Sequence, residues 1–420
     1  VVAFLARAER LRRVELERSR ALRGRLRPGG AARIGPGRAS GRAAVGGYCR
    51  WEDERGEDAP TKRGFPNRGV NQGGRMTPRI KQRLMRAAGA PSFGRFVELL
   101  ERLGDRNTHL LRVLTYHRVD EPAARPDLYP RLISATPGEF ARQMEYVASA
   151  CRAVDVAEVL RAARGDGRLP PRTVLITFDD AYRDFAEHAW PVLRRYGVPA
   201  TVFVPTAYPS GEIQSFWWDR LHHAISRRLA GRPLATPRGH LPLECERDRA
   251  LAVRRLMRYA KTLPHHELEE MMDEVCPRRN DSSSSRSVLS WEGLRRLAAE
   301  GVTLAPHTRT HPLLSRVTLD DAESQVIQSR DDLVREIGAT PPVFAYPGGA
   351  FTGEVVSMLR RRGFELAFTT CRGVNELRRA DSLRLRRINV GSRTPTSLFR
   401  AQLLPALRHC NFCWPVTEAY

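Results

Sequence analysis

The stretch "TVLITFDD", residues 173–180, runs from apolar and β-branched residues straight into two adjacent carboxylates, Asp179 and Asp180. Such a run is typical of a strand buried on both faces of a parallel sheet. Residues 182–197 then have the spacing of an amphipathic helix that ends at a glycine, and 200–208 read as the next strand. Two like charges at the end of a buried strand are unfavourable unless a cation neutralises them. The stretch therefore predicts a βαβ unit with a cation beside its first strand.

The same alternation of strands and helices extends over most of the chain. About seven such units in one run favour a distorted (β/α) barrel over an open sheet, with its site at the carboxyl ends of the strands. The other strands are expected at 110–119, 302–308, 342–349, 365–370 and 385–390. The other helices are expected at 137–149, 290–301, 319–338 and 354–363.

Segments of different character interrupt and flank this alternation. Residues 209–286 predict a helical insertion in the barrel. Residues 1–75 carry 18 Lys+Arg against 8 Asp+Glu and are rich in Arg, Gly and Ala, so we expect a disordered basic extension. A helical lead-in at 76–109, the barrel at 110–400 and a C-terminal tail at 401–420 complete the predicted organisation.

The composition limits the partners that the chain is expected to have. A net charge of +23 suits a polyanion, but few aromatic residues stand among the arginines of the extension, so we do not expect nucleic acid binding. No apolar run is long enough for a transmembrane helix. The first residues make a poor signal peptide, because the apolar run is short and its arginines follow it. These features favour a cytoplasmic location and do not indicate an oligomeric state.

Seven cysteines are scattered along the chain, and this odd number is not typical of a disulfide framework. The close pair "CNFC" at 410–413 lacks a second pair that would complete a tetrahedral zinc site. We therefore interpret it as incidental.

A second informative stretch is "PHTRTHP", in which His307 and His311 stand four residues apart. Pro312 pushes His311 toward extended geometry, so a loop at a strand end is expected rather than a helix. Two histidines, one carboxylate and open positions are typical of a catalytic metal site. One of the paired aspartates can then bind the metal, and the other can stay ionised as a general base.

With these motifs in place, residues 111–391 resemble the polysaccharide deacetylase family, a carbohydrate esterase group that includes chitooligosaccharide and peptidoglycan deacetylases. "TFDDAY", "HTRTH" and "AYPGG" are similar to the first, second and third motifs of the family. The resemblance implies a distorted (β/α) barrel. It also implies hydrolysis of an N-acetyl group on an amino sugar of a poly- or oligosaccharide by a divalent metal, usually zinc.

The resemblance also assigns roles to single residues. Asp179 would be the general base, and Asp180, His307 and His311 would bind the metal. The backbone N–H of Tyr346 would help to bind the developing oxyanion.

The third motif departs from the family in one position. Many members have an arginine two residues before the proline, where it orients the catalytic aspartate, and this chain has Ala345 there. Either Arg386 or Arg387 of the late strand can supply a guanidinium, and strand alternation puts these two on opposite faces. The pattern that the family shows on this strand favours Arg386.

The late histidine motif that supplies the general acid of the family has no clear counterpart. His409 lies far along the chain, and His117 ends the first strand of the barrel. The acid could also be a metal-bound water, or Asp179 itself after it takes up a proton. The aromatic pair Trp217 and Trp218 could stack on sugar rings, but packing of the insertion onto the barrel is the favoured interpretation.

Two other functions fit the same residues. An O-acetyl esterase or another amidohydrolase would use the same site chemistry. A non-catalytic glycan-binding relative would explain the missing arginine and histidine, but the chain keeps all four metal and base positions, which favours an enzyme.

Overall fold

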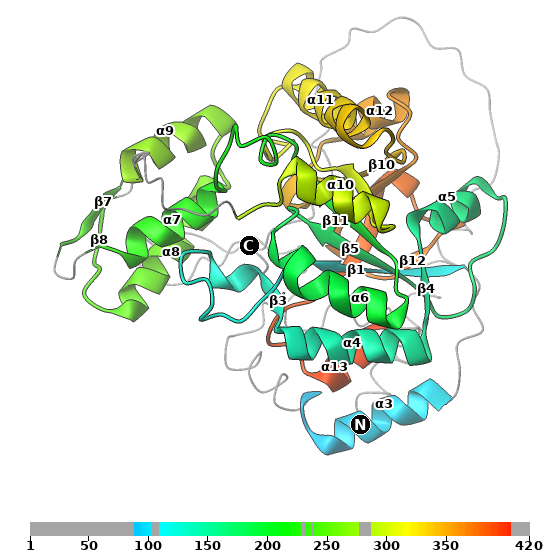
Figure 1. The fold of residues 1–420 in the computed structure, drawn as a ribbon. Helices are drawn as coiled ribbons and strands as arrows, with labels where there is room; N and C mark the ends of the chain where they lie inside the picture. The colour runs from blue at the N-terminus through cyan, green and yellow to red at the C-terminus, as the bar shows by residue number, and fades with distance from the viewer. Residues whose placement is uncertain (1–87, 103–108, 229–231, 237–238, 277–286, 405–420) are drawn as a thin grey trace, which may run out of the picture. The chain divides into compact units, whose positions relative to one another are not determined.

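The computed structural model describes residues 88–102, 109–228, 232–236, 239–276 and 287–404 (Figure 1). The predictions for the basic extension, the cysteine pair at 410–413 and His409 lie outside these residues.

Seven parallel strands form the central sheet, in the order β10-β11-β13-β1-β5-β6-β9. They are β1 (Leu110–Tyr116), β5 (Thr173–Asp179), β6 (Ala200–Val204), β9 (Thr303–Pro306), β10 (Val343–Ala345), β11 (Leu366–Arg372) and β13 (Leu385–Asn389). Short strands lie beside them: β2 (Arg118–Val119), β3 (Ile133–Ala135), β4 (Arg152–Val154) and β12 (Asn375–Glu376). The expected α/β barrel of about seven strands is confirmed.

The barrel is nearly closed, and side chains join the two strands at its open seam, β9 and β10. Thr340 Oγ1 donates to the carbonyl oxygen of Leu304 at 2.9 Å. Farther along the seam, Nδ1 of His307 lies 2.7 Å from the carbonyl oxygen of Ala345. A side chain at the carboxyl end of β9 thus closes the seam beside the predicted site.

Helices alternate with the strands, and their ends follow local capping signals. Ser290 and Thr318 cap the helices that they precede, and Thr136 forms a capping box with Glu139. The helices of the barrel and its flanks are α3 (Pro91–Arg102), α4 (Pro137–Ala150), α5 (Val156–Arg164), α6 (Trp190–Tyr196), α10 (Trp291–Ala299), α11 (Leu319–Ile337), α12 (Gly353–Arg361) and α13 (Thr396–Gln402). A π-helical turn, η2 (Phe185–Ala189), precedes α6, and 3-10 turns are η1 (Pro130–Leu132), η3 (Pro347–Gly349) and η4 (Ser382–Arg384).

Apolar side chains fill both faces of the sheet, as strand alternation requires. The interior cluster takes residues from every strand of the barrel: Leu111, Val113, Leu175, Phe203, Ala305, Val343, Ala345, Leu366, Phe368 and Leu385. The alternate residues, such as Ile176 and Phe178 on β5, pack outward; the ring of Phe178 lies edge-on to Phe140 of α4. These residues identify the inward-facing positions of each strand, and the same facing can be followed to the strand ends, where the site lies.

The insertion leaves the barrel after β6. It contains α7 (Trp217–Ser226), an antiparallel pair of strands β7 (Leu234–Thr236) and β8 (Gly239–Leu241), α8 (Glu246–Ala260) and α9 (His265–Val275). Figure 1 shows these elements as a group beside the barrel. Its helices were predicted, whereas strands of three residues leave too short a pattern to be predicted.

A buried polar contact anchors α7 to the barrel. The carboxylate of Asp219 accepts the N–H of Tyr129 at 2.7 Å and the hydroxyl of Tyr182 at 3.0 Å. The indole N–H of Trp218 donates to the same hydroxyl at 2.9 Å, and Trp218 is 2% exposed. Burial raises the pKa of Asp219 to about 7, although these hydrogen bonds work in the opposite direction. Trp218 therefore belongs to the packing of the insertion, as expected.

Among the described cysteines, Cys151, Cys245 and Cys276 are free thiols and Cys371 is bonded in a disulfide. The spacing of the cysteines gave no indication of this crosslink. None of the described helices combines the length and hydropathy that a bilayer span requires.

Candidate active site

The predicted site residues form the layer above the apolar interior of the barrel. On β5, Leu175 faces inward, so Asp179, four residues later, has the same facing. By the same alternation, Ala305 of β9 faces inward, and so does His307, two residues later, just after the strand ends. Alternation also brings inward, at the strand ends, His117 after β1 and Arg387 on β13.

Asp180 enters the same pocket because the chain turns at the end of β5. Asp180 and Ala181 have φ angles of 73° and 51°, in the left-handed region that non-glycine residues rarely adopt. The turn leaves the side chain of Asp180 fully buried, with an exposed fraction of 0%. Adjacent aspartates therefore both reach the pocket, as the sequence suggested for a strand end.

Asp180, His307 and His311 form a group that can hold a metal ion. Oδ1 of Asp180 lies 3.5 Å from Nε2 of His307 and 3.2 Å from Nε2 of His311. The candidate ligand atoms all lie within 4.8 Å of one another, and all three residues are buried. Within the described residues, neither Nε2 atom has a hydrogen-bond partner. Two buried imidazole Nε2 atoms without hydrogen-bond partners, beside a carboxylate, fit the nitrogen and oxygen ligands that zinc and similar divalent ions take.

The fold fixes which nitrogen of His307 faces this group. Because a carbonyl oxygen can only accept, the 2.7 Å contact with Ala345 places the proton on Nδ1. Burial lowers the pKa of His307 to about 4, so the ring is neutral at neutral pH. Its Nε2 therefore presents a lone pair toward Asp180, the form that a metal ligand needs.

The insertion forms a wall against His311. The rings of Phe216 and Trp218 meet the imidazole edge-on, at centroid distances of 5.6 and 5.0 Å. Burial works to raise the pKa of Asp180, but the neighbouring histidines, His311 foremost, outweigh it and lower this pKa. The carboxylate is thus ionised at the point where the histidines converge.

Asp179 is held by Arg387 in a bidentate ion pair. Nη1 and Nη2 of Arg387 donate to Oδ1 and Oδ2 of Asp179 at 2.8 and 2.6 Å, and its Nε donates to the carbonyl oxygen of Thr369 at 2.8 Å. Both side chains are almost fully buried. Burial works to raise the pKa of Asp179, but Arg387 outweighs it and holds the pKa well below its usual range. The carboxylate is therefore oriented and ionised, as a general base requires.

The expectation that Arg386 faces Asp179 is wrong. Arg386 is exposed and contacts the backbone oxygen of Arg372 at 3.4 Å. The face of Arg387 is shared by Leu385, a member of the interior cluster, and this apolar residue was the signal that could have identified the correct arginine.

The expectation that the backbone N–H of Tyr346 binds an oxyanion is also wrong. This N–H donates to the carbonyl oxygen of Phe368 at 3.0 Å, which extends the pairing of β10 with β11 by one residue. The side chain of Tyr346 points outward into the cluster of Phe344 and Phe351, and its hydroxyl donates to the carbonyl oxygen of Leu383 at 2.9 Å. Tyr346 is thus a structural residue in this chain.

The glycines that follow Tyr346 are required by close contacts. Gly349 has a φ of 69°, and a Cβ there would lie 2.7 Å from the backbone nitrogen of Thr370. A Cβ on Gly348 would lie 2.9 Å from Cδ2 of Leu313. The Gly-rich turn therefore lets this loop approach both β11 and the loop that carries His311.

His117 is brought into the site from the end of β1. Its Nε2 lies 4.0 Å from Oδ2 of Asp179, and the side chain is 3% exposed. Burial lowers the pKa of His117, while Asp180 and Asp179 work to raise it.

A buried ion pair close to the site was not identified from the sequence. Asp184 accepts the Nε–H of Arg118 at 2.9 Å and the backbone N–H of Val119 at 3.0 Å. Burial raises the pKa of Asp184 to about 6, against the effect of Arg118. This buried pair ties the segment that follows Asp180 to β2, just after the end of β1. The signal in the sequence was Asp184 itself, a carboxylate beside apolar residues in the predicted helix 182–197.

Comparison with known proteins gives consistent matches. Residues 166–367 match the profile of the family described as polysaccharide deacetylase. YxkH of Bacillus subtilis, provisionally named a polysaccharide deacetylase, is 22% identical over 205 residues, which cover 49% of this chain and 47% of YxkH. The poly-beta-1,6-N-acetyl-D-glucosamine N-deacetylase of Escherichia coli K12 is 31% identical over 87 residues, 21% of this chain and 12% of that enzyme. The chain thus spans less than half the length of these curated relatives.

Among solved structures, the Streptococcus pyogenes deacetylase PplD in complex with acetate aligns with a TM-score of 0.48 at 19% identity. The alignment covers 71% of this chain and all of PplD.

Proposed function

Because this chain belongs to the polysaccharide deacetylase family, we propose that it is a metal-dependent hydrolase acting on N-acetylated polysaccharide. It removes N-acetyl groups from amino-sugar residues of a poly- or oligosaccharide. The observation that carries this proposal is the buried Asp179–Arg387 pair next to the group of Asp180, His307 and His311. A fixed, ionised base beside three metal-binding side chains suits hydrolysis of an amide better than binding alone.

Each residue has a separate task in this reaction. Asp180, His307 and His311 would hold a divalent ion, and such an ion would supply polarisation of the acetyl carbonyl and acidification of a water molecule. Asp179 takes the proton of the attacking water, and Arg387 keeps its carboxylate turned toward that water. The wall of Phe216 and Trp218 excludes bulk water from one side of His311.

The leaving amine needs a proton, and we assign its delivery to His117, whose Nε2 lies 4.0 Å from Asp179. His117 would take over the proton that Asp179 has removed from the attacking water and pass it to the amine. His117→Gln is expected to lower turnover by about 10²-fold, the lower end of the range for loss of an acid–base group. Zinc content, measured by atomic absorption, should stay at the wild-type value. Unchanged turnover in this variant would mean that Asp179 itself returns the proton to the amine.

The function is tested by measuring acetate release from N-acetylglucosamine oligomers and, in parallel, from O-acetylated glycans. The wild-type chain loaded with zinc should release acetate from the N-acetylated oligomers, and removal of the metal by a chelator should stop the reaction. The double variant His307→Ala/His311→Ala is the matched control, because it removes two ligands and should retain no stoichiometric zinc. Release from O-acetylated glycans alone would replace the proposal with an esterase. Stoichiometric zinc in the double variant would contradict the ligand assignment.

A further inference from the structure

The loop that carries the two histidines is held in an unfavourable backbone conformation. Thr308 and His311 have φ angles of 65° and 62°, although neither is a glycine. Non-glycine residues in this region are strained and persist only where the surroundings fix them. The loop therefore needs contacts that keep both imidazoles turned toward Asp180.

Part of this support comes from the loop itself and from β6. Thr308 Oγ1 accepts the N–H of His311 at 3.0 Å, which closes the loop on itself. Two N–H groups that follow β6 donate to the loop carbonyls: Thr206 to Thr308 at 3.2 Å, and Ala207 to Arg309 at 2.9 Å. These contacts satisfy the carbonyls of Thr308 and Arg309 but leave the N–H groups of Arg309 and Thr310 to another acceptor.

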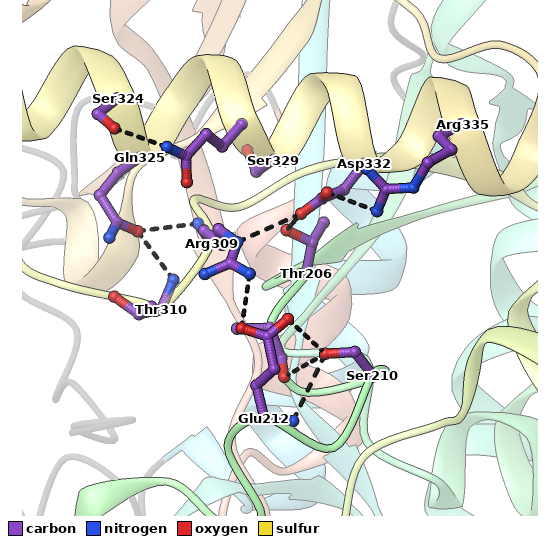
Figure 2. A network of polar contacts seen from close by, with 12 residues as sticks. Thr206, Ser210, Glu212, Arg309, Thr310, Ser324, Gln325, Ser329, Asp332 and Arg335 are labelled. Atoms are coloured by element: carbon purple, nitrogen blue, oxygen red, sulfur yellow. Dashed lines mark hydrogen bonds and ion pairs between the residues drawn. The ribbon is translucent and has the colours of Figure 1, made fainter.

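That acceptor is a single side chain on α11. Oε1 of Gln325 accepts the N–H of Arg309 at 3.0 Å and the N–H of Thr310 at 2.8 Å. Figure 2 shows the amide of Gln325 reaching from the helix to both N–H groups at once. Gln325 thus satisfies the two consecutive donors in the middle of the loop, between the two histidines.

The side chain of Arg309 adds a second, weaker connection, also drawn in Figure 2. Its guanidinium bonds Glu212 at 2.5 Å and lies 3.6 Å from Asp332, which accepts the hydroxyl of Thr206 at 2.7 Å. Arg309 and Glu212 are partly exposed, so solvent screens this pair and it contributes little. The neutral bonds to Gln325 act on the backbone directly and are the stronger constraint on the loop.

We propose that Gln325 is a positioning residue for the metal site: its carbonyl oxygen holds the backbone between His307 and His311 in the conformation that directs both rings at Asp180. This inference rests on the metal-binding group of the proposed function but not on the identity of the substrate. The bonds of its Oε1 to the loop go to the backbone N–H groups of Arg309 and Thr310, so Gln325 acts on the site through the loop backbone.

The test compares Gln325→Met, which keeps the length of the side chain but has no carbonyl oxygen, with Gln325→Glu, which keeps an acceptor. Gln328→Met is the matched control, because Gln328 lies one turn along α11, is exposed and bonds only Ser324 among the described residues. Zinc affinity is measured by competition with a chromogenic chelator. Gln325→Met should weaken zinc binding by about 10-fold or more, the range for groups that orient metal ligands. Gln325→Glu and Gln328→Met should bind within about 3-fold of the wild type.

Hydrogen exchange of the metal-free proteins provides a readout that does not depend on zinc. The amides of Arg309 and Thr310 should be protected in the wild type and in Gln328→Met, and should lose protection in Gln325→Met. Wild-type zinc affinity with intact protection in Gln325→Met would overturn the inference, as would a Gln325→Glu variant as weak as Gln325→Met. Zinc binding by the wild type without acetate release would contradict the proposed function and leave the inference standing.

Discussion

Asp179→Asn is expected to lower turnover by about 10²- to 10⁴-fold, the range for removal of a general base. Asparagine has nearly the same shape as aspartate and leaves the three metal-binding side chains in place, but it cannot take a proton from water. Steady-state acetate release and zinc content, measured on the same preparations, check this prediction.

The same substitution removes the negative charge that pairs with Arg387, so some loss of stability is expected as well. Urea unfolding of both proteins gives the size of this loss, and turnover is compared at a temperature at which each is fully folded. Wild-type turnover in a zinc-loaded Asp179→Asn protein would mean that Asp179 is not the base. Loss of zinc together with turnover would place Asp179 among the ligands.

Arg387→Ala is expected to lower the free energy of unfolding by about 3–5 kcal/mol at neutral pH, because it leaves the buried carboxylate of Asp179 without its counter-charge. Turnover should fall too, since nothing else holds that carboxylate in a fixed orientation among the contacts described. The pKa of Asp179 is lowered in the folded chain, so the stability from this pair is present above the unfolded pKa of about 4 and is lost as pH falls through the folded pKa. The difference between wild type and variant should therefore shrink below about pH 4.

Arg386→Ala is the matched control for this prediction, because it removes the same side chain from the neighbouring position. Arg386 is exposed, so its substitution should change stability by no more than about 0.5 kcal/mol and leave turnover unchanged. Equal losses in the two variants would show that general charge, rather than the bidentate contact with Asp179, supports the site.

The strands, the helix ends and the meeting of Asp180, His307 and His311 could be predicted because each depends on a local pattern. Asp180 and His307 follow apolar runs, and parallel strands bring such ends together at one edge of a barrel. The facing of a strand is also periodic, but its phase depends on which apolar neighbours lie inside. Leu385 lies in the interior cluster, so Arg387, two residues later, faces the interior and Arg386 faces outward. The prediction of Arg386 was wrong because it did not take the facing of Leu385 into account.

The role of Tyr346 could not be read from its own motif for a different reason. Whether a backbone N–H is available depends on the partner strand, and β11 lies more than 20 residues farther along the chain. Gln325 belongs to the same class of residue, since a half-buried polar side chain on a helix has no periodic signal. Contacts of this kind between distant segments are visible only in the folded chain.

The anchoring of α7 links the integrity of the site to the cohesion of the insertion. The ring of Trp218 lies against that of His311, and its indole N–H donates to the hydroxyl of Tyr182. That hydroxyl donates in turn to Asp219, and Tyr182 follows Asp180 by only two residues. Local opening that frees α7 would therefore unpack one candidate metal ligand, His311, and disturb the turn that carries another, Asp180. The insertion and the site then open together as one cooperative unit. The rate at which α7 opens, measured by hydrogen exchange of its amides, sets an upper limit on the lifetime of the intact group of Asp180, His307 and His311.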